Sequence, residues 1–94
     1  MNVEIKFFTS LREITGRKVD ILQLKTIISV EELFSMLFKK YGEEFGEYVY
    51  NKECKVQDFL SILVNGKNIN TLQGLGTELK EGDTVAILPP VGGG

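Results

Sequence analysis

The sequence predicts an α+β fold in which a mixed β-sheet packs against one main helix. Three observations indicate it. Apolar and polar residues alternate near the N-terminus, a capped amphipathic helix follows, and short apolar segments separated by turns fill the second half. With 94 residues and 43% apolar side chains, the chain has the size and composition of one domain with its own core. We therefore expect residues 1–94 to form a single domain.

The N-terminal part is expected to form a hairpin. Residues 3–8 predict a half-buried strand, because every second side chain is apolar. These inward side chains are Val3, Ile5 and Phe7. A connector closed by Gly16 leads to a second predicted strand, residues 18–24, in which we expect Val19 and Ile21 to point inward.

The main helix is predicted over residues 30–41. Its apolar residues recur at the i, i+3, i+4 and i+7 positions of one stripe: Val30, Leu33, Phe34, Leu37, Phe38 and Tyr41. Ser29 and Glu32 have the spacing of a capping box, and Gly42 suits a left-handed C-cap. A second, shorter helix is expected over residues 43–50.

The second half of the chain supplies the remaining strands. Residues 59–64 form an apolar run that ends at an Asn-Gly pair, a strong hairpin signal, so residues 67–69 are expected to return as a short edge strand. The last strand is predicted over residues 84–88. The order β-β-α-β-β-β is that of a β-grasp, or ubiquitin-like, fold, in which the first and last strands lie side by side at the centre of the sheet.

Composition excludes several function classes. Eleven Lys and Arg against thirteen Asp and Glu leave no basic excess, so we expect no nucleic-acid partner. The absence of histidine removes His-dependent catalysis, and Cys54 alone makes neither an internal disulfide nor a multi-cysteine metal site. No apolar run is long enough for a membrane span and no signal peptide is apparent, so we expect a cytoplasmic protein without a membrane partner.

The C-terminal segment, residues 89–94, is expected to be a flexible tail. It begins with two stiffening prolines and ends in three glycines, which fit a channel too narrow for any side chain. The group it delivers is the carboxylate of Gly94, ionised at neutral pH. Because a carboxylate is a poor acylating agent, it requires activation, most simply as an acyl-adenylate made from ATP by another protein. A frayed chain end is the alternative interpretation.

The strand phase also predicts an apolar patch close to this tail. If the alternating residues above face the helix, then Phe8, Leu63 and Leu88 face the other way from neighbouring strands. An exposed patch of this kind usually marks a partner surface. The alternative is that residues 43–58 fold over it.

Three stretches, VEIKFFTSLREITG, VNGKNI and EGDTVAILPPVGGG, resemble the MoaD family, the small subunits of molybdopterin synthase, over most of the chain. The resemblance implies that an E1-like adenylyltransferase uses ATP to adenylate the terminal glycine. A sulfur donor then converts it to a thiocarboxylate, which enters the large subunit of molybdopterin synthase and supplies dithiolene sulfur. The resemblance places the sulfur on Gly94, beside Gly93, and partner contacts at Phe8 and Leu88. Gly92 departs from the family, which often has a larger residue there.

The resemblance further implies that the chain is a sulfur-donor subunit with no cofactor or metal of its own, and that it does not catalyse the reaction alone. We expect the residues that contact partners to be Phe8, Leu63, Leu88, Pro89, Pro90, Val91 and Gly92. Three alternatives stay open: a ubiquitin-like modifier attached to lysines, a thiamine-pathway sulfur carrier, and an interaction module with an inert tail.

Overall fold

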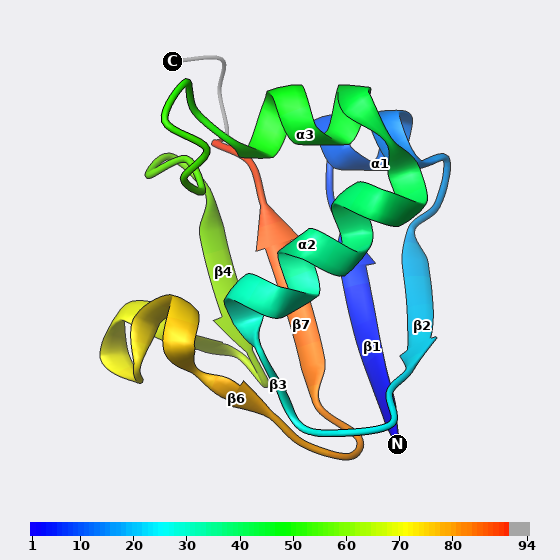
Figure 1. Ribbon diagram of the computed structural model, residues 1–94, viewed down its shortest axis with the longest axis vertical. Helices are drawn as coiled ribbons and strands as arrows, with labels where there is room; N and C mark the ends of the chain where they lie inside the picture. The colour runs from blue at the N-terminus through cyan, green and yellow to red at the C-terminus, as the bar shows by residue number, and fades with distance from the viewer. Residues whose placement is uncertain (91–94) are drawn as a thin grey trace.

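The computed structural model describes residues 1–90, in which a five-stranded mixed sheet packs against helices (Figure 1). The strands lie in the order β2-β1-β7-β4-β5. They are β1 (Asn2–Phe7), β2 (Val19–Gln23), β4 (Ser61–Val64), β5 (Lys67–Asn68) and β7 (Thr84–Leu88). As the sequence predicts, β1 and β7 are central neighbours; they run parallel, and the other pairs in this sheet are antiparallel. This arrangement is a β-grasp.

The remaining elements are short, apart from helix α2. They are α1 (Ser10–Thr15), β3 (Ile28–Ser29), α2 (Val30–Tyr41), α3 (Glu43–Val49), the 3-10 turns η1 (Ile69–Thr71) and η2 (Gly74–Gly76), and β6 (Glu78–Leu79). Strands β3 and β6 pair with each other in a separate two-stranded ribbon. None of the helices in residues 1–90 is long and apolar enough to cross a bilayer.

Helix α2 begins at the predicted residue because its first turn is capped reciprocally. Ser29 Oγ accepts a hydrogen bond from the backbone N–H of Glu32, and Glu32 Oε1 accepts one from the backbone N–H of Ser29, both at 3.1 Å. The helix then buries four residues of its apolar stripe completely: Val30, Leu33, Phe34 and Leu37. Phe38 is 41% exposed, so the fully buried stripe ends about one turn before the helix does.

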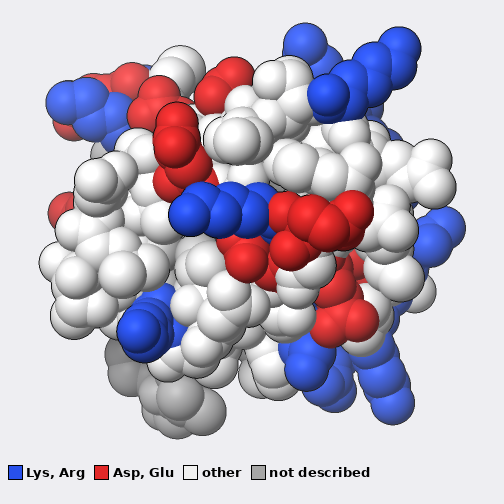
Figure 2. Space-filling model, turned by 90° about the horizontal axis from the view of Figure 1, so that it is seen from below, with Lys and Arg blue, Asp and Glu red and all other residues white. Residues whose placement is uncertain are grey.

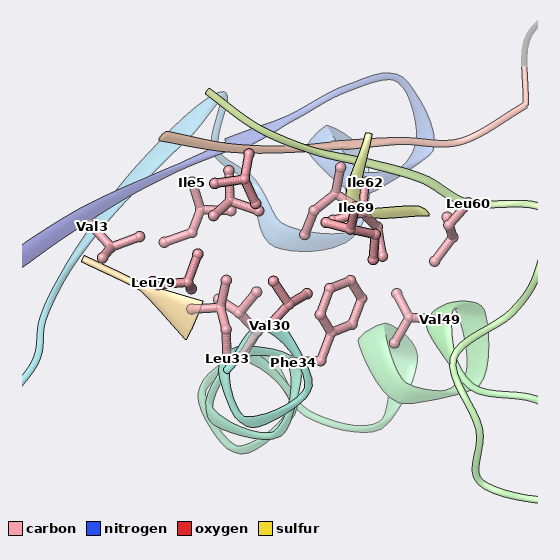
Figure 3. Close-up of a cluster of buried hydrophobic side chains, with 14 of the residues drawn as sticks. Val3, Ile5, Val30, Leu33, Phe34, Val49, Leu60, Ile62, Ile69 and Leu79 are labelled. Atoms are coloured by element: carbon pink, nitrogen blue, oxygen red, sulfur yellow. The ribbon is translucent and has the colours of Figure 1, made fainter. Parts of the chain in front are cut away.

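The core lies between the sheet and the layer that α2 and α3 form (Figure 3). Val3 and Ile5 of β1 point from the sheet toward the layer that holds α2, and Val49 of α3 lies at the other end of the cluster from Val3, beside Leu60. Since both helices lie on the same side, neither covers the opposite face of the sheet, which we call the outer face. Burial of these side chains is the main favourable term for folding.

The predicted inward phase of β2 is wrong. Val19 and Ile21 are 41% and 58% exposed, whereas Asp20 is only 4% exposed. The register explains this, because Asp20 pairs with the buried Ile5 and cross-strand partners share a face. The inward position is therefore held by a carboxylate rather than by an apolar side chain.

A charged hydrogen-bond cluster makes the burial of Asp20 tolerable. Asp20 Oδ2 accepts hydrogen bonds from Lys40 Nζ at 2.7 Å and from Tyr41 Oη at 2.5 Å. Burial raises the pKa of Asp20. The two hydrogen bonds and the charges of Lys40 and Arg17 lower it by more than burial raises it, so the pKa of Asp20 lies below its usual range. Burial and the contact with Asp20 raise the pKa of Tyr41. The cluster fastens the edge strand β2 to the C-terminal end of α2.

We expect Asp20→Asn to lower the free energy of unfolding by about 1.5–3 kcal/mol, because it weakens two charge-assisted hydrogen bonds at a buried site. Folding lowers the Asp20 pKa. The difference in unfolding free energy between variant and wild type is therefore largest above about pH 4, the pKa of an unfolded Asp, and it shrinks as the pH falls below that value. Urea denaturation from pH 2.5 to 7 measures both effects, with the exposed Asp58→Asn as the matched control. Equal losses in the two variants would contradict the anchoring role.

Gly42 joins α2 to α3 in a conformation that only glycine adopts readily. Its φ of 89° and ψ of −162° differ from the left-handed cap that the sequence predicts. The reason is that one residue both ends α2 and begins α3. Its N–H donates to the carbonyl of Phe38 at 2.8 Å, and its carbonyl accepts from the N–H of Gly46 at 3.2 Å.

Gly42→Ala should destabilise the fold by about 1–3 kcal/mol, because its positive φ strains any residue that has a Cβ. An added Cβ would meet nothing within 4 Å at Gly42 or at Gly76, and Gly76 does not have a positive φ. Gly76→Ala is therefore the matched control, and we expect it to change the melting temperature little. A similar loss in both variants would show that the backbone angle at Gly42 is not the cause.

Candidate functional site

The C-terminal segment leaves the sheet directly from its central strand β7. Leu88, the last residue of β7, is half-buried, Pro89 is buried and Pro90 is exposed. Pro89 is therefore packed against the body of the protein, and the flexible tail over residues 89–94 stays a prediction. The predictions for the last four positions, Val91, Gly92, Gly93 and Gly94, lie outside the described residues and stay predictions.

Phe8, Leu63 and Leu88 lie on the outer face, as the strand phase predicts. Each is half-buried and adjoins a residue whose side chain points into the core on the other face. Strand β7 lies between β1 and β4, with Leu88 opposite Ser61 and Leu63 opposite Ala86. The three side chains therefore belong to one surface, next to the point where the C-terminal segment leaves.

Residues 43–58 do not fold over this surface. Phe45 and Val49 of α3 are fully buried in the core cluster that α2 shares, on the other side of the sheet. The alternative in which this region covers the predicted patch is therefore wrong.

Sequence reasoning missed two further members of the surface, Val19 and Ile21. Their exposure on β2 follows from the inward position of Asp20, and the register places Val19 opposite Lys6 and Ile21 opposite Glu4. The sequence does contain a signal for this phase of β2. Leu22 and Leu24 are apolar and lie two and four residues after Asp20, so they share its face of the strand. We define the outer-face patch by its apolar residues: Phe8, Val19, Ile21, Leu63, Ala86 and Leu88.

Two cations accompany the patch: Arg12 lies beside Phe8, and Lys6 lies nearer the middle of the patch. Arg12 Nε donates to the carbonyl of Phe7 at 3.0 Å, and its guanidinium lies 5.4 Å from the centre of the Phe8 ring. Lys6 is exposed between Val19 and Ala86. The opposite end of the molecule differs, because acidic side chains gather near its centre (Figure 2).

Comparison with known proteins identifies the family. The profile of the ThiS family matches residues 5–94, which is nearly the whole chain. The chain belongs to the ThiS family. It is 31% identical to small archaeal modifier protein 3 of Haloferax volcanii, over all of both chains. It is 30% identical to the molybdopterin synthase sulfur carrier subunit of Drosophila melanogaster, over all of this chain and 92% of that one.

A solved structure supports the same assignment. The solution structure of small archaeal modifier protein 1 from Methanosarcina acetivorans superposes with a TM-score of 0.84 at 33% identity, over 99% of this chain and 96% of that one. The ThiS-family chain is thus a ubiquitin-like β-grasp protein of the sulfur-carrier and modifier class. The resemblance to MoaD-type sulfur carriers is confirmed at the level of the family.

This ThiS-family chain also has a concave region on the helix side of the sheet. An open groove of about 1310 Å³ lies between α2, α3 and the loop after α3, and its lining includes Phe38, Tyr50 and Cys54. Cys54 is exposed, and burial raises the pKa of Tyr50 although a hydrogen bond with Ser35 opposes the rise. Within residues 1–90, no group of three His, Cys, Asp or Glu side chains is placed to hold a metal ion.

Proposed function

We propose that this chain is a sulfur carrier and serves as the small subunit of molybdopterin synthase. The observation that carries the proposal is the junction of the outer-face patch with the C-terminal segment. Leu88 belongs to the patch, and the uncharged sequence Pro-Pro-Val-Gly-Gly-Gly follows it directly. A partner that covers the patch is therefore within a few residues of the carboxylate on which it acts.

The chemistry needs nothing from the chain except that carboxylate. In the proposed reaction an oxygen of Gly94 attacks the α-phosphorus of ATP held by an E1-like adenylyltransferase, and pyrophosphate leaves. Hydrosulfide supplied by the sulfur donor then attacks the acyl carbon, AMP leaves and the S–H proton passes to solvent, so that a thiocarboxylate results. The molybdopterin synthase large subunit would receive this end and use its sulfur for the dithiolene. ATP is a cofactor of the partner, and we assign none to this chain.

The described residues suit such a role energetically. Association would remove the apolar side chains of the patch from water, which favours binding roughly in proportion to the area covered. Pro89 and Pro90 restrict the backbone before the glycines begin, so less entropy is lost when the segment is threaded into a channel.

A protein modifier is the second candidate function. It is favoured by the 31% identity over the full length of small archaeal modifier protein 3. Both functions share the adenylate of Gly94. They differ in the nucleophile that displaces AMP, which is sulfur in the carrier and the ε-amine of a target lysine in the modifier.

Intact mass spectrometry tests the carrier chemistry. We expect the wild-type chain, incubated with ATP, the E1-like adenylyltransferase and a sulfur donor, to gain the mass that replaces one oxygen by sulfur, mapped to Gly94. Gly94→Ala should abolish the gain without unfolding the domain, because a Cβ obstructs a channel built for glycine.

Gly76→Ala is the control for this experiment, since it makes the same chemical change far from the tail. Normal sulfur loading of Gly94→Ala would contradict the proposal. If the wild-type chain appears instead as an isopeptide on lysine residues, the modifier is the correct function.

The outer-face patch is tested by substitution of its members. Phe8→Ala, Leu63→Ala and Leu88→Ala should each weaken binding to the E1-like adenylyltransferase about 5- to 30-fold, the range expected for apolar side chains central to an interface. Leu72→Ala removes a 41% exposed leucine outside the patch and should leave binding unchanged. Isothermal titration measures the affinities. Equal affinities for all four variants would rule the patch out as the docking surface.

A further inference from the structure

Lys6 occupies a central position within the outer-face patch. The register places it opposite Val19 of β2 on one side and opposite Ala86 of β7 on the other. Phe8, two residues further along the chain, points to the same face. Apolar residues therefore adjoin an exposed ammonium group on three sides.

No carboxylate within residues 1–90 neutralises Lys6 at short range. The ion pairs within 4.0 Å in this part of the chain are those of Asp20 with Arg17 and with Lys40. Glu4 shares the strand and the face with Lys6 but is not within that distance. In the free protein the ammonium of Lys6 thus depends on water.

A partner that covers the patch removes this water. An ammonium group buried without a counter-charge is strongly unfavourable, whereas a carboxylate opposite it restores both the charge balance and the hydrogen bonds. At the rim of an interface, a lysine avoids this cost because its long side chain can extend the charged head into solvent. Lys6 lies on β1, one strand in from the edge of the sheet, with β2 on one side and β7 on the other, so a partner that covers both neighbouring strands obstructs this escape.

We propose that Lys6 determines which partner docks. The surface of the partner that covers the outer-face patch must be apolar and must carry a carboxylate opposite Lys6. The occupant is the E1-like adenylyltransferase, so this inference rests on the proposed function. The chain has a net charge of −2, which repels an acidic partner from most approaches. Local attraction at Lys6 then favours the one orientation that also brings the C-terminal segment to the partner.

Charge reversal at Lys6 tests the inference. We compare wild type with Lys6→Glu and Lys6→Met in ATP–pyrophosphate exchange catalysed by the purified E1-like adenylyltransferase from the same organism. Lys6→Glu should raise the KM for the carrier at least about 30-fold and Lys6→Met about 5-fold, with kcat little changed. The KM of wild type should also rise more steeply with salt than that of Lys6→Met.

Lys67→Glu is the matched control. Lys67 is an exposed lysine on the edge strand β5, opposite the inward-facing Val64, and its reversal makes the same change in net charge. It should leave the KM within about twofold of wild type. Thermal melting of each variant verifies that it is folded, and a partner variant with the opposing carboxylate changed to lysine should restore activity to Lys6→Glu.

The outcomes separate the two proposals. If the wild-type chain is adenylated while Lys6→Glu and Lys67→Glu have equal KM values, the inference on Lys6 is overturned and the proposed function stands. If the wild-type chain supports no exchange at all, the proposed function fails and the assigned partner fails with it. A selective loss in folded Lys6→Glu, recovered by charge reversal in the partner, supports the inference on Lys6 and the adenylation step of the proposed function.

Discussion

Parallel pairing of β1 with β7 is the constraint on which the rest of the structure depends. It joins Glu4–Phe7 to Thr84–Ile87, two segments that are almost a whole chain length apart. Parallel neighbours cannot be linked by a tight turn, so the intervening chain must cross from one end of the sheet to the other. The crossover contains α2 and α3, which form the second layer. The same pairing places the end of β7, from which the C-terminal segment leaves, beside residues from the start of the chain.

One-sided coverage of the sheet follows from this arrangement and decides where function is located. The chain offers only one long amphipathic helix, α2, with α3 beside it, and both bury their apolar side chains on the same face. The outer face therefore keeps half-buried apolar residues such as Phe8 and Leu88 that no helix covers. Exposed apolar surface of this kind often marks a partner surface, and under the proposed function it is where the partner enzymes dock.

Under the proposed function, a division of labour between the chain and its partners accounts for the lack of catalytic groups in the sequence. A protein whose reactive group is its own terminal carboxylate needs no acid, base or metal ligand. What it must provide is a rigid platform and a reproducible distance from the docking surface to the chain end. The capped helix, the Asp20 cluster and the buried Pro89 all serve rigidity. The cations Lys6 and Arg12 give the outer-face patch a local positive charge, opposite in sign to the net charge of the chain.

The sequence by itself determined the features that depend on contacts between near neighbours. The Ser29–Glu32 capping box, the turn at Asn65-Gly66 and the buried stripe of α2 through Leu37 are all of this kind, because each is specified within one or two turns of chain. The alternation of Val3, Ile5 and Phe7 likewise fixed which face of β1 is buried. The resemblance to the MoaD family could also be recognised from the sequence, because it depends on short motifs and their order along the chain.

Only the tertiary structure decided the features that depend on distant partners. Alternation in β2 is compatible with either phase, and the choice was made by Lys40 and Tyr41, which supply hydrogen bonds that let Asp20 take the inward position. The exposure of Val19 and Ile21, and hence the extent of the outer-face patch, followed from that choice. In each case the deciding free energy lies in contacts that no local pattern contains.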